Sequence, residues 1–211
     1  MSGIKICGLF RDIDIDYVNE AMPDCAGFIL YFPKSHRNID PERARELISA
    51  LSEGIKAVGV FVDLPLETVA ETASFIGLDA VQLHGHEDRD YILTLREKTG
   101  LPVWKAFRVR SGEDLEQARL SPADEVILDN GYGTGETFDW DLLGGFSRKF
   151  ILAGGLTPEN IPEALRLYSP GMIDISSGVE TDRKKDREKI IAAVRAVRTY
   201  DENKNRKEKE I

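Results

Sequence analysis

Short runs of apolar residues recur along the chain, and most are apolar throughout instead of alternating with polar positions. We predict eight β-strands, at residues 4–9, 25–30, 56–62, 80–85, 103–108, 125–130, 149–155 and 172–177. Their starts lie roughly 21 to 31 residues apart, which is the spacing of one strand-plus-helix unit. Because continuous apolar runs are typical of strands covered on both faces, the pattern favours a parallel sheet.

Segments with helical spacing of apolar residues separate these strands. The sequence predicts helices within residues 40–51, 64–77, 157–168 and 186–200. Asp40 is a candidate N-cap with Pro41 at the first helical position, and Gly77 is a natural C-cap. Eight such units favour a single-domain α/β protein, a (β/α)8 TIM barrel over residues 1–200. An open doubly wound sheet is the alternative if a weak strand, such as 103–108, is not a strand.

Composition and charge restrict the location and the partners. The chain has 211 residues, 42% of them apolar, and a formal net charge of −9, which argues against nucleic acid or an anionic membrane as partner. We expect no signal peptide, because the first residues lack a long apolar stretch and a cleavage signature. No run approaches the roughly 18 apolar residues that span a membrane, and the chain has two cysteines. We therefore expect a cytoplasmic protein, either monomer or homodimer. Residues 201–211 are highly charged and are expected to form a flexible tail.

In a (β/α)8 barrel the groups that carry chemistry lie at the carboxyl ends of the strands. This rule separates the two cysteines, because Cys7 ends the first predicted strand whereas Cys25 begins the second, at the opposite face. Cys7 alone carries no functional signal, since free cysteine is most often a buried apolar residue. Asp129 ends the sixth predicted strand, where a carboxylate is either a turn residue bonded to backbone amides or a functional group.

Glycines and serines follow the last two predicted strands. Gly154 and Gly155 lie in "LAGGLTPEN", and Ser177 and Gly178 lie in "DISSGVE". Small residues let backbone N–H groups approach an anion closely, and the start of a helix adds a favourable dipole. The loops after strands seven and eight hold phosphate in many such barrels, so we predict a phosphate site here.

Three further motifs are less specific. "FPKSHRN" carries a basic cluster of Lys34, His36 and Arg37. A guanidinium suits bidentate binding of a carboxylate, although a solvated loop explains the cluster equally well. His84 and His86 in "HGHEDRD" are two residues apart and would point to opposite faces of a continuing strand, so we expect no metal site. "GYGTG" at 131–135 does not match a dinucleotide fingerprint and is interpreted as a mobile lid.

Together these motifs resemble the phosphoribosylanthranilate isomerase family. The resemblance covers residues 4 to about 199 and is carried by "KICG", "PKSHR", "GVFV", "VQLHG", "ILD", "GTGETFDW", "LAGGLTPENI" and "DISSGVE". It implies an isomerase of tryptophan biosynthesis that acts by general acid/base catalysis. The implied reaction is the Amadori rearrangement of N-(5′-phosphoribosyl)anthranilate to 1-(2-carboxyphenylamino)-1-deoxy-D-ribulose 5-phosphate, with no cofactor and no metal.

The resemblance also implies roles for individual residues. It places the general base at Cys7, the general acid at Asp129, and Arg37 on the anthranilate carboxylate. It places the following residues at or near the substrate: Gln82, Gly154, Gly155, Asp174, Ser177 and Gly178. For these roles we expect the pKa of Cys7 to lie below about 8.5 and that of Asp129 above about 3.9.

Two other functions compete with this interpretation. The first is a related barrel isomerase that acts on a different phosphoribosyl amine, as in histidine biosynthesis. That chemistry would more naturally use a carboxylate base than Cys7 at the end of the first strand. The second is a barrel that binds sugar phosphates without catalysis, which needs neither Cys7 nor Asp129.

Overall fold

The strands of this computed structural model, which describes residues 2–129, 143 and 145–209, close into a barrel. The barrel strands are β1 (Gly3–Cys7), β2 (Cys25–Leu30), β4 (Lys56–Phe61), β5 (Ala80–Leu83), β6 (Val103–Arg108), β7 (Glu125–Asp129), β8 (Phe150–Ala153) and β9 (Met172–Ile175). They pair in parallel in this order, and β9 pairs with β1. The short β3 (Asn38–Ile39) pairs with the end of β2. The predicted barrel is confirmed, and the open sheet is wrong because β1, which ends the strand order next to β9, also pairs with β2 and closes the ring.

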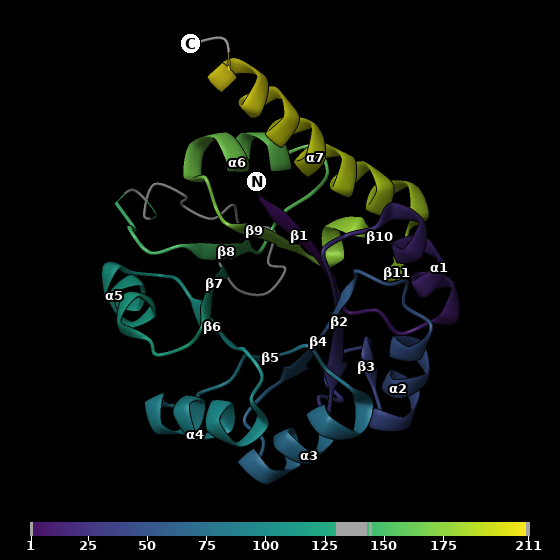
Figure 1. The fold of residues 1–211 in the computed structure, drawn as a ribbon, viewed down its shortest axis with the longest axis vertical. Helices are drawn as coiled ribbons and strands as arrows, with labels where there is room; N and C mark the ends of the chain where they lie inside the picture. The colour runs from purple at the N-terminus through teal and green to yellow at the C-terminus, as the bar shows by residue number, and fades with distance from the viewer. Residues whose placement is uncertain (1, 130–142, 144, 210–211) are drawn as a thin grey trace.

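Helices surround the ring of strands (Figure 1). They are α1 (Asp12–Ala21), α2 (Pro41–Ser49), α3 (Leu66–Ile76), α4 (Arg89–Thr99), α5 (Gly112–Leu120), α6 (Ile161–Tyr168) and α7 (Arg187–Lys209). Asp40 caps α2 through the Arg43 N–H, and Gly77 ends α3 in a left-handed conformation, both as predicted. After β9 the chain forms a 3-10 turn, η2 (Ser177–Val179), and a hairpin of β10 (Glu180–Thr181) and β11 (Lys184–Lys185).

Alternate residues of each strand belong to two separate cores. One core fills the barrel and includes Cys25, Val58, Trp104 and Ile127. The other lies beneath the helices and includes the even-numbered residues of β1 and β2, such as Ile4, Ile6 and Phe28. Because strand side chains alternate between faces, Lys5 and Cys7 point into the barrel, as do Gln82, Asp129 and Asp174 on their strands.

Three aspartates each connect two neighbouring strands at the end of the barrel where the strands begin. Each precedes a strand, accepts a hydrogen bond from a backbone N–H of the strand before, and donates its own N–H to the carbonyl of that same residue. The pairs are Asp24 with Ile4, Asp79 with Ala57, and Asp124 with Val103, at 2.7 to 2.8 Å for the carboxylate bonds. They satisfy N–H groups near the start of these strands.

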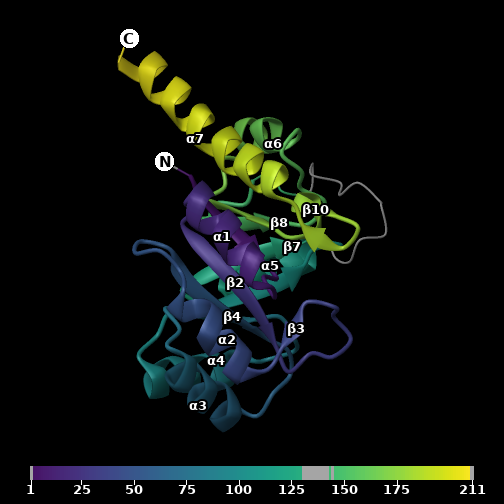
Figure 2. The ribbon, with the colours of Figure 1, turned by 90° about the vertical axis from the view of Figure 1, so that its right-hand side faces the viewer.

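The last helix is longer than predicted. Helix α7 continues to Lys209 and projects past the barrel, so the predicted boundary at residue 200 lies inside a helix (Figure 2). Charge alone suggested a tail, but glutamate, lysine and arginine are also good helix formers. Asp201 is buried and accepts a 2.7 Å hydrogen bond from the Ser2 N–H. Flexibility of residues 201–211 in solution stays a prediction.

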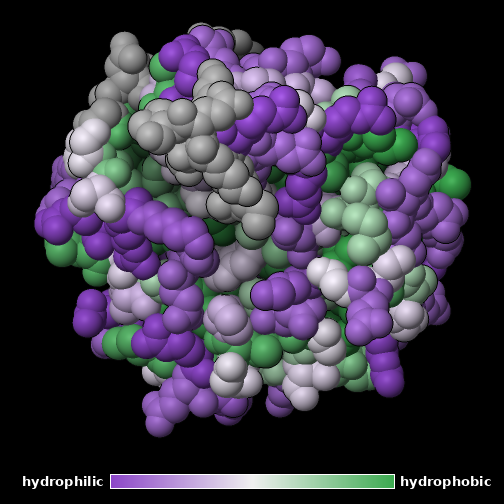
Figure 3. Space-filling view, turned by 45° about the horizontal axis from the view of Figure 1, so that its top comes forward, coloured by the Kyte–Doolittle hydropathy of each residue, from purple (hydrophilic) through white to green (hydrophobic). Residues whose placement is uncertain are grey.

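The surface agrees with the charged composition. In the face drawn in Figure 3, hydrophilic residues predominate and hydrophobic residues form smaller patches between them. Among the described residues, no helix is long and apolar enough to cross a membrane.

We expect Asp79→Ala to lower the free energy of unfolding by about 1 kcal/mol, because the Ala57 N–H loses a charge-assisted hydrogen bond at a partly hydrated site. Urea denaturation at neutral pH measures the change. The control is Asp16→Ala, which removes an exposed aspartate of α1 that has no hydrogen-bond partner among the described residues. Equal stability of the two variants would contradict the role given to these aspartates.

Candidate active site

A buried ion pair lies inside the barrel between β1 and β9. Lys5 and Asp174 are directly opposite each other in the strand register. The Lys5 ammonium donates to both carboxylate oxygens of Asp174, at 3.0 and 2.9 Å, and the two residues are 0% and 7% exposed. Burial disfavours the ammonium, but the negative charges of Asp174 and Cys7 outweigh burial and raise the pKa of Lys5 above its usual value. Asp174 thus binds a lysine that carries no functional signal in the sequence.

Cys7 occupies the next inward position on β1, at the carboxyl end of the strand. A Cβ atom placed on Gly27 would lie 2.8 Å from the Cys7 Sγ and 3.0 Å from the Lys5 Nζ, so the two groups share one small space above β2. Burial raises the pKa of the Cys7 thiol, and Lys5 opposes this shift only in part. The predicted lowering of the Cys7 pKa is therefore wrong, because desolvation of the thiolate exceeds the effect of the nearby ammonium.

Cys25 differs from Cys7 as the sequence predicted. It begins β2, at the opposite end of the barrel, and both cysteines are free. Burial raises the pKa of Cys25 to about 12. Cys25 is thus an unreactive apolar residue of the barrel interior.

Asp129 and Gln82 lie on strands that face β1 across the barrel. Asp129 ends β7, and its Oδ2 is 3.4 Å from the Nε2 of His84, which directly follows β5. Gln82 lies on β5, two residues before His84, and is 2% exposed. Its Oε1 is buried without a hydrogen-bond partner, which is costly unless a donor from a bound molecule supplies one.

Arg37 forms a bidentate ion pair inside the protein. Its Nε and Nη2 donate to the two carboxylate oxygens of Glu180 at 2.6 and 2.7 Å. Burial favours the neutral acid, but Arg37 and the Lys185 charge prevail and lower the pKa of Glu180 to about 2. Glu180 was missed as a site residue, although it closes the motif "DISSGVE".

Lys185 connects the hairpin to the strand end that carries the site. Its Nζ donates to the Ser176 carbonyl at 2.9 Å and to Glu180 at 2.7 Å, and its side chain is fully buried. Burial lowers the pKa of Lys185, against the opposing charge of Glu180. The turn between β10 and β11 uses Asp182 and Arg183 at φ values of 51° and 61°, a left-handed conformation that costs energy in residues with a Cβ.

The two predicted phosphate loops are in contact. Gly154 and Gly155 follow β8 with positive φ, and Ser177 and Gly178 lie in η2 after β9. A Cβ on Gly178 would overlap the Leu156 carbonyl, so only glycine allows the loops to approach this closely. The Ser176 hydroxyl donates to the Cys7 carbonyl at 2.9 Å and places the β9 loop beside the end of β1. The structure therefore brings the loop after β9 next to Cys7 and packs the loop after β8 against it.

The remaining motifs of the sequence are residues 131–135 and the two histidines after β5. The proposed lid at 131–135 and the short loop that contains it lie outside the described residues. His86 pairs with Asp63 at 2.9 Å and is almost fully exposed, whereas His84 faces Asp129. Within the described part of the chain, no three histidine, cysteine or carboxylate residues are placed to hold a metal ion.

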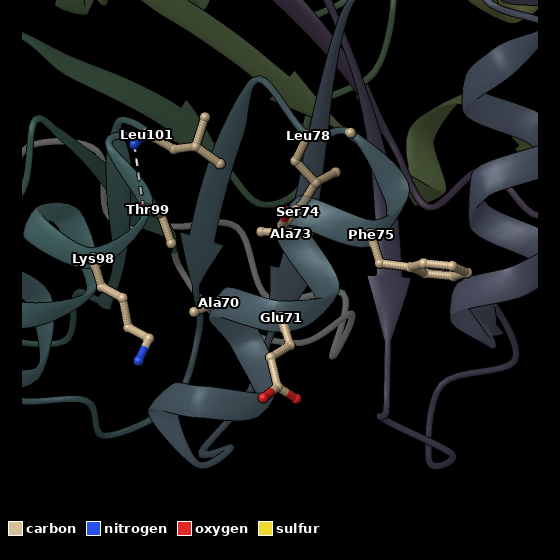
Figure 4. Close-up of a pocket in the computed structure, with 10 residues that line it drawn as sticks. Ala70, Glu71, Ala73, Ser74, Phe75, Leu78, Lys98, Thr99 and Leu101 are labelled. Carbon is tan, nitrogen blue, oxygen red and sulfur yellow. Dashed lines mark hydrogen bonds between the residues drawn. The ribbon is translucent and has the colours of Figure 1, made fainter.

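A groove of about 670 Å³ lies on the outer surface between α3 and α4 (Figure 4). Its lining is mostly apolar and small, with Phe75, Lys98 and Glu71 at the margins. The groove lies in the helix layer, away from Cys7 and Asp129, and so is separate from the candidate active site.

The fold is a (β/α)8 barrel that carries Cys7 and Asp129 at the carboxyl end of its strands and brings its last two loops into contact there. Residues 4–196 match the family model described as N-(5′phosphoribosyl)anthranilate (PRA) isomerase. The chain belongs to this family.

Individual relatives agree over nearly the full length. The N-(5′-phosphoribosyl)anthranilate isomerase of Thermoanaerobacter sp. (strain X514) is 44% identical over 205 residues, covering 94% of this chain and 98% of the relative. The crystal structure of phosphoribosyl anthranilate isomerase from Thermotoga maritima is 36% identical, with a TM-score of 0.86 and coverage of 94% and 100%. A further solved structure of a phosphoribosyl anthranilate isomerase, 35% identical with a TM-score of 0.84 and coverage of 94% and 100%, is in complex with reduced 1-(o-carboxyphenylamino)-1-deoxyribulose 5-phosphate.

Folding lowers the pKa of Glu180 from 4.5 to about 2, so its ion pairs contribute stability that is complete above pH 4.5 and is lost as the pH falls toward 2. We expect Glu180→Gln to be less stable than the parent at neutral pH. Its free energy of unfolding should also change less between about pH 5 and pH 2. Urea titrations across this range measure both effects. The control, Glu97→Gln, changes the same charge at an exposed position of α4. An acid response in Glu180→Gln equal to that of the parent would contradict the ion pairs described here.

Proposed function

We propose that this chain catalyses the Amadori rearrangement of N-(5′-phosphoribosyl)anthranilate to 1-(2-carboxyphenylamino)-1-deoxy-D-ribulose 5-phosphate. The observation that carries the proposal is the placement of Cys7 and Asp129 on facing strands, beside the loops that suit a phosphate. Family membership supports the reaction, and the ligand of the complexed relative is a reduced form of this product. We place the reaction in the cytoplasm, which the free cysteines support.

The two anionic ends of the substrate match two cationic or amide-rich regions. The phosphate would bind backbone N–H groups of Gly154, Gly155, Ser177 and Gly178. The anthranilate carboxylate would bind Arg37, whose Nε and Nη2 donate to Glu180 and whose Nη1 has no hydrogen-bond partner among the described residues. Binding at both ends orients the ribose between Cys7 and Asp129.

In the first step Asp129, as the carboxylic acid, gives its proton to the furanose ring oxygen. The bond between C1′ and this oxygen breaks, and the nitrogen lone pair forms the C1′=N double bond of an iminium ion. The acid must be protonated before the step, and the anionic substrate together with exclusion of water favours this form. The His84 Nε2 lies 3.4 Å from the Asp129 Oδ2, so the imidazole lies beside the acid.

In the second step Cys7, as the thiolate, removes the proton from C2′. The electrons of the broken C–H bond form the C1′=C2′ bond, and the iminium nitrogen regains its lone pair to give an enolamine. Loss of the enol proton and protonation of C1′ then yield the ketone. Since the Cys7 pKa is raised by burial, the positive charge of the iminium is the contribution from the substrate that favours the thiolate. Gln82 would offer its unpartnered Oε1 to the amine N–H.

We expect Cys7→Ala and Asp129→Asn each to lower kcat by at least about 100-fold, because each removes one proton-transfer group. Loss of phosphoribosylanthranilate fluorescence measures turnover, and calorimetry with the reduced product measures retained binding. The control is Cys25→Ala, which removes the other buried thiol and should keep its activity.

Activity of either variant near that of the parent would contradict the assigned roles. Absence of turnover by the parent chain would favour the other phosphoribosyl amine as substrate if that compound is converted. Binding of the reduced product without any turnover would favour the non-catalytic barrel.

A further inference from the structure

Lys5 is among the largest fully buried side chains of the described structure, yet no step of the proposed reaction uses it. We propose that Lys5 is a positioning residue for catalysis: anchored by Asp174, its ammonium holds negative charge on the Cys7 sulfur. The proposal rests on the proposed function, because it assumes that Cys7 is the base that removes the C2′ proton.

The geometry restricts the direction of the ammonium. An ammonium has three donors. Two are engaged by the carboxylate oxygens of Asp174, at 2.9 and 3.0 Å. The Nζ and the Cys7 Sγ both approach the same point above Gly27, at 3.0 and 2.8 Å. The third donor is therefore available to the sulfur, and a side chain at position 27 would fill the space in which they meet.

The other charges around Cys7 come from two further elements. Asp174 on β9 disfavours the thiolate, and Lys185 on β11 favours it. Of these groups, Lys5 is the strongest that favours the thiolate, and Arg37 is already neutralised by Glu180. An opposite charge within about 4 to 6 Å changes a pKa by about 1 to 3 units. Loss of Lys5 should therefore reduce the thiolate fraction by about 10-fold or more at a pH below the pKa.

Asp174 then has a role that differs from direct substrate binding. It fixes the position of the ammonium, but its own charge opposes the thiolate. The two members of the ion pair should thus act on Cys7 in opposite directions. An ion pair with a purely structural role would not shift the Cys7 pKa in opposite directions, since loss of either partner would disturb the same contact.

The test is the rate of alkylation of Cys7 by iodoacetamide as a function of pH. It is measured in a Cys25→Ala background, in which Cys7 is the remaining thiol. We expect Lys5→Met to lower the rate at about pH 8 by at least 10-fold and to move the profile to higher pH. We expect Asp174→Asn to move it to lower pH. The matched control is Lys105→Met, which removes another buried lysine, paired with Glu87 at 3.0 Å in the helix-side layer, and should leave the profile unchanged.

Circular dichroism establishes that each variant is folded. If Lys5→Met does not fold, Lys5→Met/Asp174→Asn leaves no unpaired charge and should still give a profile at higher pH than Asp174→Asn alone. A Lys5→Met profile that coincides with the parent, or shifts of equal sign in Lys5→Met and Asp174→Asn, would overturn the proposal. Failure of the proposed function is distinguishable, because it would appear as turnover by Cys7→Ala, whereas alkylation does not require catalysis.

Discussion

The ion pair between Lys5 and Asp174 is the constraint on which the barrel and its site both depend. It lies across β1 and β9, the strands whose pairing closes the ring. Burial of two charges is costly, and removal of one partner from such a pair typically costs about 3 to 5 kcal/mol because the other charge stays unpaired. The register that closes the barrel is therefore the register that places an ammonium beside Cys7.

The charge around Cys7 is opposite in sign to the net charge of the chain. The protein carries a net charge of −9. Among the described residues around Cys7, however, Lys5, Lys185 and Arg37 pair with Asp174 and Glu180, so these five side chains carry one positive charge in excess. A substrate that carries both a phosphate and a carboxylate suits this local excess, and each carboxylate of the cluster fixes the direction of a cation.

Features that depend on neighbouring residues in the chain could be predicted from the sequence. Continuous apolar runs indicated each strand, including 103–108, which is β6, and strand ends indicated Cys7 and Asp129. The partners of these groups were not accessible in this way, because Lys5 and Asp174 are 169 residues apart and Arg37 and Glu180 are 143 apart. The Cys7 pKa was mispredicted for a related reason, since it depends on the balance between burial and Lys5, which only packing determines. The aspartates before β2, β5 and β7 resembled ordinary loop residues.

The central claim is that Lys5 and Asp174 serve the thiolate that removes the C2′ proton. Single-turnover rates with substrate deuterated at C2′ test it most directly, because they isolate proton removal from product release. For the parent we expect a primary isotope effect. For Lys5→Met we expect the same isotope-sensitive step to be slower near pH 8 and to recover as the pH rises and the thiolate forms. A Lys5→Met rate equal to that of the parent at every pH, or slowed by a factor independent of pH, would contradict the claim.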